Sequence, residues 1–343
     1  MVKYCIKRIL LSLLILLGVS LILYVLVRIM PTSYFEEKLN GILSSGAEIN
    51  KEERLYEMLS YYGLEDSSPW GVITGYFRWL GVVPYDDGTF RGLLQGNLGQ
   101  TFTNGNNVAD EIFKNMGVSF AVSFISLILQ LIIAVPLGIR CAVNQYGKLD
   151  YFATVLTMIG ISFPSFFFGS LLIKIFGVQL GWFPVNGLVD TLPVGTSEWT
   201  RFWNMAYHLV LPMIVLVILN VGSMMRYTRT NTLEILNADY IRTARAKGLS
   251  ENTVIYKHAF RNTLIPLVTT LAGILPGLFG GSMITEQLFA LPGIGQMAYQ
   301  ALRSGDIPFI MGYNMFIAVL TVIGILLTDL MYAVVDPRVK LGK

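Results

Sequence analysis

Residues 115–139 read NMGVSFAVSFISLILQLIIAVPLGI and contain no charged side chain, although Lys114 and Arg140 stand directly at their two ends. A hydrocarbon core of about 30 Å takes about 20 helical residues to cross, and unpaired backbone groups cannot lie in lipid. The stretch is therefore long enough to cross a bilayer as an α-helix. It predicts a membrane protein.

Five more uncharged stretches of membrane-spanning length lie along the chain, so we predict an all-α, polytopic protein with six transmembrane helices. Hydrophobic residues make up 54% of the sequence and charged residues only 14%, against about 25% in a soluble domain. A net charge of +3 is too small and too dispersed to indicate nucleic-acid binding. The other five stretches run from Arg8 to Arg28, Asp150 to Lys174, Arg201 to Arg226, Arg261 to Glu286, and Asp306 to Asp329.

The first stretch belongs to an N-terminal anchor at residues 1–30. Its basic start could also open a cleaved signal peptide, but the apolar run is longer than a signal core and no small-residue cleavage site comes after it. Residues 31–115 then form an extracytoplasmic segment, and residues 116–343 form a core with five transmembrane helices.

The distribution of lysine and arginine predicts the orientation, because basic short loops remain on the cytoplasmic side. The segment between the fourth and fifth stretches, residues 227–263, is rich in basic residues, whereas the short loops of the opposite side carry Arg201 and Arg303. We therefore expect this segment and both termini in the cytoplasm. Long loops cross largely regardless of charge, so the acidic 31–115 segment can lie outside.

The chain lacks the residues of an energy source or an enzyme. It has no G-x-x-x-x-G-K-[S/T] loop for nucleotide phosphates, and no carboxylate or histidine lies well inside a span. His208 and His258 are expected to be structural, and no metal-ligand pattern is present. Cys5 and Cys141 both fall on the cytoplasmic side, where a disulfide is not expected. Energy must come from another subunit.

Residues 234–250 predict a short cytoplasmic helix with defined ends. Asn237 or Asp239 can cap its start, and Gly248 can adopt the left-handed conformation that closes it. A second helix is expected to begin with Ser250 as its N-cap. Small side chains leave room for a partner surface, and Arg242 and Arg245 can pair with acidic groups there. A basic helix on the membrane surface is the alternative interpretation.

With this loop the chain resembles permease subunits of ATP-binding-cassette importers of the oligopeptide, dipeptide and nickel class, in particular the first permease of each pair. The resemblance rests on DYIRTARAKGL at 239–249 and RNTLIP at 261–266, and extends through GNLGQTF at 96–102, GISFPSF at 160–166 and LPGIG at 291–295. Arg242-Thr243-Ala244 replaces the Glu-Ala-Ala of the general importer form, as is usual in this subclass. The outer segment around 42–85 departs from the family pattern, which leaves the solute open.

The resemblance implies a type I importer permease fold in a bacterial cytoplasmic membrane, with a second homologous permease, two ATPase subunits, an extracytoplasmic binding protein and lipid as partners. No cofactor is expected in this chain, because ATP and Mg²⁺ would bind the ATPases. The loop would dock into an ATPase groove. The residues implied in that coupling are Asp239, Tyr240, Arg242, Thr243, Ala244, Arg245, Ala246, Lys247 and Gly248.

The solute pathway is harder to locate from sequence. Prolines within or beside the spans, such as Pro136 and Pro266, can bend helices around a passage. Nickel or another small solute is an alternative to peptides; a channel or stand-alone carrier, and a receptor built on the outer segment, are alternatives of other classes. The candidate solute-facing residues are Ser162, Phe163, Phe166, Asn220 and Glu286.

Overall fold

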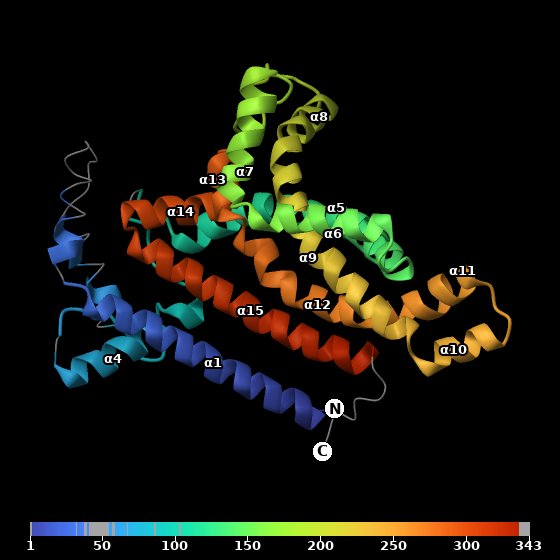
Figure 1. Ribbon diagram of the computed structural model, residues 1–343. Coiled ribbons are helices and arrows are strands. Elements are labelled where there is room, and N and C mark those ends of the chain that lie inside the picture. Colours follow the sequence, from blue (N-terminus) through green and yellow to red (C-terminus); the bar gives the residue numbers. More distant parts are fainter. Residues whose placement is uncertain are drawn as a thin grey trace. The chain divides into compact units, whose positions relative to one another are not determined.

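The computed structural model describes residues 2–31, 33–37, 40, 55–56, 59–66, 68–85, 87–102 and 104–335. Within these ranges the chain is helical, and its β-structure is a single isolated bridge between Gln100 and Asn107. The chain divides into two compact units. In Figure 1 the ribbon is coloured by residue number from the N-terminus (blue) to the C-terminus (red). The first contains the residues up to Asn115 together with Met297–Ile323. The second contains Met116–Gln296 and the part of the last helix from Gly324 onward.

The first unit joins the anchor helix to the outer segment. Its elements are α1 (Val2–Ile29), α4 (Pro69–Leu80), η1 (Leu93–Gln95) and the first residues of α5 (Val108–Val143) and α15 (Ile307–Val335). Ser68 caps α4 by accepting a hydrogen bond from the Gly71 N–H, and Gly81 ends the helix at φ 89°. Helix α1 packs against α4 within this unit.

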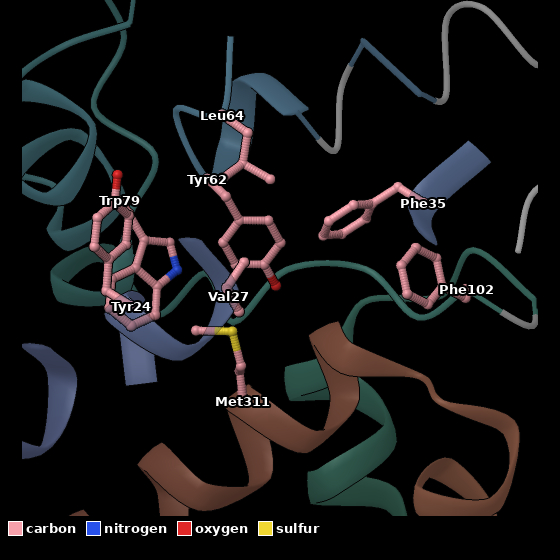
Figure 2. Packing of buried hydrophobic residues seen from close by; sticks show 8 residues of the cluster. All are labelled: Tyr24, Val27, Phe35, Tyr62, Leu64, Trp79, Phe102 and Met311. Carbon is pink, nitrogen blue, oxygen red and sulfur yellow. The ribbon is translucent and has the colours of Figure 1, made fainter. Parts of the chain in front are cut away.

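A cluster of buried aromatic and aliphatic side chains holds the first unit together (Figure 2). Tyr24 of α1 lies 5.7 Å from Trp79 of α4 between ring centroids. The Phe102 N–H donates to the Asp306 carboxylate at 2.9 Å, which fixes the segment before α5 to the start of α15. The cluster consists of Tyr24, Val27, Phe35, Tyr62, Leu64, Trp79, Phe102 and Met311.

The second unit contains most of the other helices. Its long members are α5, α9 (Val210–Leu236) and α12 (Phe260–Gly280), and α8 and α10 lie at opposite ends of α9 (Figure 1). Helix α14 (Ile294–Ser304) begins in this unit and ends in the first. The others are α6 (Lys148–Ser162), α7 (Ser165–Leu172), η2 (Ile173–Gln179), α8 (Glu198–His208), α10 (Asp239–Ala246), α11 (Glu251–Thr253), η3 (Val254–Ala259) and α13 (Met283–Leu288).

Four helices of the described chain are long and apolar enough to cross a membrane: Ile6–Ile29, Val108–Val143, Val210–Leu236 and Ile307–Asp329. They account for four of the six predicted spans. The predicted fifth span corresponds to α12, which is 21 residues long. The count of six crossings stays a prediction.

The third and fourth predicted spans differ from straight helices. The third is bent by 100° between α6 and the helix that begins at Ser165. Phe163 is extended with ψ 130°, because the ring of Pro164 disfavours a helical conformation in the residue before it. The fourth divides at Leu209 into α8 and α9, and α9 continues past Arg226 to Leu236.

Small residues let the helices of the second unit approach backbone to backbone. A Cβ added to Gly138 of α5 would lie 2.7 Å from the Met225 carbonyl oxygen of α9. A Cβ on Gly222 of α9 would lie 3.0 Å from the Thr157 carbonyl oxygen of α6. In a bilayer the lipid tails are as apolar as the side chains, so burial of apolar side chains gives little driving force and helices associate through close packing of this kind. Thus α5 and α6 both pack directly on α9.

Candidate functional site

Helix α10 occupies the loop that the sequence singled out. Its N-cap is Ala238, extended at ψ 148° and without a side-chain cap, so the predicted cap at Asn237 or Asp239 is wrong. The Asn237 side chain instead donates to the Leu233 carbonyl at the end of α9. Gly248 has φ +78° and its N–H donates to the Arg245 carbonyl at 2.9 Å, which confirms the predicted left-handed stop.

One face of α10 is buried and attaches it to its neighbours. Ile241 is fully buried and Ala244 is 7% exposed; both pack with Val254 and Ala259 of η3. The last residues of α9, Ile235 and Leu236, pack against the same cluster. An eight-residue helix is too short to be stable alone, so this packing holds α10 in place. Sequence reasoning missed Ile241, although its i, i+3 spacing to Ala244 indicates an amphipathic helix.

The opposite face of α10 is open. Of the nine predicted coupling residues, Ala244 belongs to the buried face and the other eight are exposed. The structure therefore brings Asp239, Tyr240, Arg242, Thr243, Arg245, Ala246, Lys247 and Gly248 to one accessible surface, which we call the α10 surface.

Two arginines of the α10 surface have acidic neighbours in the chain itself. Arg245 donates through Nε to Glu251 Oε1 at 2.7 Å, linking α10 to α11. Ser250 occupies the predicted N-cap position of α11, but its side chain makes no capping hydrogen bond. Arg242 lies 3.6 Å from Asp239, and both side chains are mostly exposed. Exposed pairs of this kind contribute little, about 0–1 kcal/mol, so they can exchange partners readily.

A cavity of about 540 Å³ lies in the second unit among α5, α9 and α12. Its polar lining is made of hydroxyl and amide groups, and every described residue that lines it is neutral. The Gln130 side chain of α5 donates to the Asn220 carbonyl of α9 at 3.1 Å, and Ser223 donates to the same oxygen at 2.9 Å. The polar lining residues are Ser123, Ser126, Gln130, Asn220, Ser223, Tyr227, Thr270 and Ser282.

Of the five predicted solute-facing residues, only Asn220 lines this cavity. Ser162, Phe163 and Phe166 are exposed at the break between α6 and α7. The polar stripe that sequence reasoning missed was readable, because Ser123, Ser126 and Gln130 have the helical spacing i, i+3, i+7 along α5.

Glu286 is buried, whereas the sequence predicted a solute-facing side chain. It is 1% exposed, and its carboxylate accepts hydrogen bonds from the Ser282 N–H at 3.0 Å and the Gln296 N–H at 3.1 Å. A Cβ on Gly293 would lie 2.3 Å from this carboxylate, so the surrounding backbone fits closely around it. Because two backbone donors and the crowding enclose the charge, Glu286 fixes a turn and does not face solute in this structure.

His208 is also held by the fold. It is 5% exposed, its Nδ1 lies 3.1 Å from the Gly187 carbonyl, and its Nε2 lies 3.2 Å from Asp190. The side chain of Asn204, and after it that of His208, holds the pKa of the Asp190 carboxyl below its usual range. These contacts tie α8 to the loop before it, in line with the structural role predicted for His208.

The first unit has a cavity of its own, of about 500 Å³, with aromatic and amide walls. Burial raises the pKa of Tyr85 to about 12, with Arg78 and Arg91 opposing the rise from 5.5 and 5.6 Å over the ring. Its hydroxyl is therefore a proton donor at neutral pH, and it donates to the Tyr61 carbonyl. The residues that line this cavity all belong to the first unit and come from the outer segment and from Pro308 of α15.

Comparison with known proteins gives consistent matches. Residues 134–341 match the family described as binding-protein-dependent transport system inner membrane component. The oligopeptide transport system permease protein AppB of Bacillus subtilis is 36% identical over 341 residues, covering 99% of this chain and 100% of that protein. The dipeptide transport system permease protein DppB of the same organism is 32% identical, covering 100% and 99%.

A solved structure shows the same fold. An inward-facing conformation of the MetNI methionine ABC transporter superposes with a TM-score of 0.52 at 19% identity. The match covers 66% of this chain and 96% of the other. At that identity the likeness concerns the fold.

Proposed function

Because the chain belongs to the family of inner membrane components of binding-protein-dependent transport systems, we propose that it is a permease subunit of an ATP-driven peptide importer. The two Bacillus subtilis relatives are permeases of oligopeptide and dipeptide transport systems, which favours peptides over the nickel alternative. The observation that carries the proposal is the α10 surface, an exposed face on a helix whose other face is buried.

The coupling step depends on the attachment of α10. A nucleotide-driven partner can shift the permease between states only through contacts that differ between those states. The α10 surface supplies such contacts, and the buried cluster at Ile241 passes a displacement on to α9 and η3. In this proposal each of two ATPase subunits, which bind ATP and Mg²⁺, docks on the α10 surface of one permease.

The neutral cavity forms one wall of the solute pathway, and a second, homologous permease supplies the other. Hydroxyl and amide groups can hydrogen-bond to a peptide backbone whatever its side chains are, and a lining without charge holds no solute tightly. Such a passage suits a transporter whose selectivity resides in an extracytoplasmic binding protein. Alternating exposure of the cavity would accompany the approach and separation of the two coupling helices.

The proposed topology places α10 and both termini in the cytoplasm of a bacterial cell. Helix α9, at 27 residues, extends about 40 Å, so α8 and α10 lie on opposite sides of the membrane. The basic residues gathered around α10 favour the cytoplasmic side for that end.

The test is reconstitution of the chain with its second permease, ATPases and binding protein in liposomes. A peptide library should stimulate ATP hydrolysis and accumulate inside, and Arg242→Glu on the α10 surface should lower ATPase binding. Arg201→Glu is the matched control, since it makes the same change on exposed α8. Stimulation by nickel but not by peptides would remove the peptide assignment. Solute flux without any ATPase would support a channel or carrier instead.

A further inference from the structure

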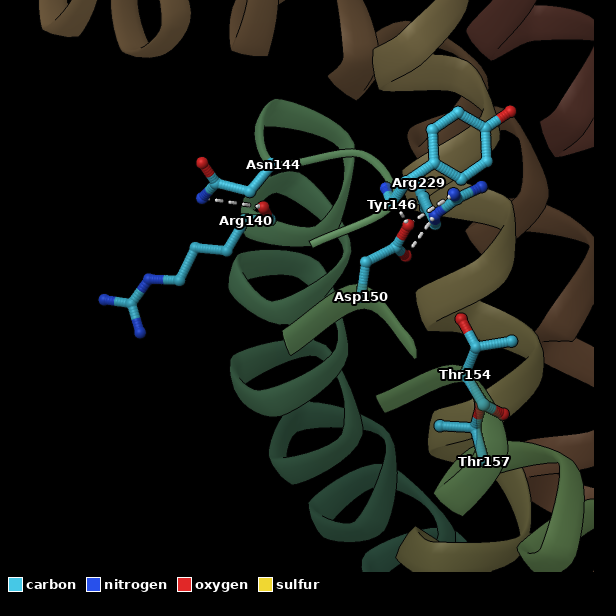
Figure 3. A network of polar contacts seen from close by, with 7 residues as sticks. All are labelled: Arg140, Asn144, Tyr146, Asp150, Thr154, Thr157 and Arg229. Carbon is cyan, nitrogen blue, oxygen red and sulfur yellow. Dashed lines mark hydrogen bonds and ion pairs between the residues drawn. The ribbon is translucent and has the colours of Figure 1, made fainter. Parts of the chain in front are cut away.

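An ion pair joins α6 and α9 of the second unit, and the turn before α6, close to α10. Arg229 of α9 donates through Nε and Nη2 to the two oxygens of Asp150, both at 2.7 Å. The Tyr146 N–H donates to the same carboxylate at 2.9 Å (Figure 3). The Asp150 side chain is 5% exposed and that of Arg229 is 22% exposed. Bidentate geometry with a third donor makes this a rigid connection.

The pair connects the turn between α5 and α6 to the cytoplasmic part of α9. Asp150 lies in the first turn of α6, and Tyr146 lies in the preceding turn with a φ of 61° that is unusual for a residue with a side chain. On the other side, Arg229 lies two turns, about 10 Å, before the end of α9 at Leu236. Arg140, also drawn in Figure 3, points away from the pair.

The pair also lies directly beyond the neutral cavity. Tyr227, two residues before Arg229, lines the cavity from α9, and Gln130 lines it from α5. Gly138 of α5 touches the α9 backbone at Met225. The helices that form two of the cavity walls are therefore fixed to each other at the end nearest α10.

We propose that Asp150 and Arg229 are positioning residues that make the α5–α6 hairpin move as one body with α9 and α10. A displacement received on the α10 surface passes through the Ile241 cluster to the end of α9 and, through the ion pair, to the hairpin. Both α5 and α9 then move when nucleotide binds, and the cavity opens or closes as a whole. Neither residue contacts solute in this role. The inference rests on the proposed function of the α10 surface.

The first experiment measures whether the connected parts move together. Spin labels at Lys148→Cys and Glu234→Cys, in a background of Cys5→Ser and Cys141→Ala, report the distance between the hairpin and the end of α9. In the assembled transporter that distance should be the same without nucleotide and with ATP trapped. In Asp150→Asn it should broaden or change between the two states. A distance that changes in the otherwise unaltered protein would overturn the proposal, whichever solute is carried.

The second experiment measures uptake per ATP hydrolysed. Asp150→Asn and Arg229→Gln should keep ATP hydrolysis while uptake per ATP falls roughly three- to thirtyfold. Arg229→Lys keeps the positive charge but cannot form the bidentate pair, so its uptake per ATP should lie between those of the unaltered protein and Arg229→Gln. Arg201→Gln is the control for loss of a surface arginine. If a neutral variant does not assemble, Arg229→Lys and the distance measurement in the unaltered protein still test the positioning role.

The outcomes separate the two proposals. An unchanged uptake-to-ATP ratio in the Asp150 and Arg229 variants refutes the positioning role while the importer stands. Failure of the unaltered complex to bind ATPase or respond to any peptide refutes the proposed function instead. A lower melting temperature with a normal ratio shows a merely structural pair and overturns the inference.

Discussion

The attachment of α10 can be tested with Ile241→Ala. The side chain is fully buried against Ala244, Val254 and Ala259, so truncation removes three carbon atoms from a packed cluster. At about 0.8 kcal/mol for each carbon the lost burial amounts to roughly 2.4 kcal/mol, and the remaining cavity brings Ile→Ala losses to about 2–5 kcal/mol. An isolated helix of eight residues has little stability of its own to offset this loss.

The loss should appear locally, in the docking of α10 onto η3. A change of about 2 kcal/mol shifts that docking equilibrium roughly thirtyfold. Amide hydrogen exchange of residues 239–248 should therefore accelerate, and ATPase affinity should fall by at most the same factor. Ile284→Ala, at a side chain that is 48% exposed in α13, is the matched control. Unchanged exchange in α10 together with unchanged ATPase affinity would refute the argument that the buried face holds the helix.

Three further outcomes are expected in the second unit. Gly138→Ala should overpack against α9, which costs about 1–3 kcal/mol of folding free energy and should lower the melting temperature. A Cβ on Gly117 of the same helix meets nothing within 4 Å, so Gly117→Ala should not lower it. Glu286→Gln should destabilise by about 1–3 kcal/mol, measured by thermal unfolding, because an amide group would face a backbone N–H. The lowered pKa of Asp190 stabilises the fold above its unfolded pKa of about 3.9, and that contribution is lost as pH falls through the folded pKa. Asp190→Asn should therefore show a smaller loss of melting temperature between pH 5 and pH 3.

Four of the spans were predictable because lipid imposes a length and excludes charge, and both can be counted in a sequence. Their ends were less predictable. The fourth span is predicted to end at Arg226, yet α9 continues to Leu236. Arg229, two turns before the end of α9, pairs with Asp150 of α6. The bend at Pro164 was visible in the sequence as a proline, but a count of uncharged residues does not detect a change of direction.

Among the site residues, too, features set by the local sequence could be predicted, whereas contacts between distant residues could not. Gly248 was predicted because left-handed backbone is a local property of glycine. Glu286 was misread because its partners, the N–H groups of Ser282 and Gln296, come together only in the fold. A lone carboxylate at the end of an apolar stretch looks solute-facing until its hydrogen bonds are known. Asn220 lines the neutral cavity together with residues of α5 and α12 that are distant in the sequence, so the solute-facing role predicted for it stays a prediction.

In the proposed importer, the placement of charge in the second unit matches the separate demands of solute passage and coupling. A charge on the cavity wall would bind some peptides and repel others, and the described lining has none. A connection that carries displacement needs geometry that thermal motion cannot easily loosen, and the Asp150–Arg229 pair has two short parallel hydrogen bonds with little exposure. The same α9 carries Asn220 in the cavity and Arg229 just beyond it. A double variant with a charged side chain at position 220 and an amide side chain at position 229 should therefore impair both solute release and coupling.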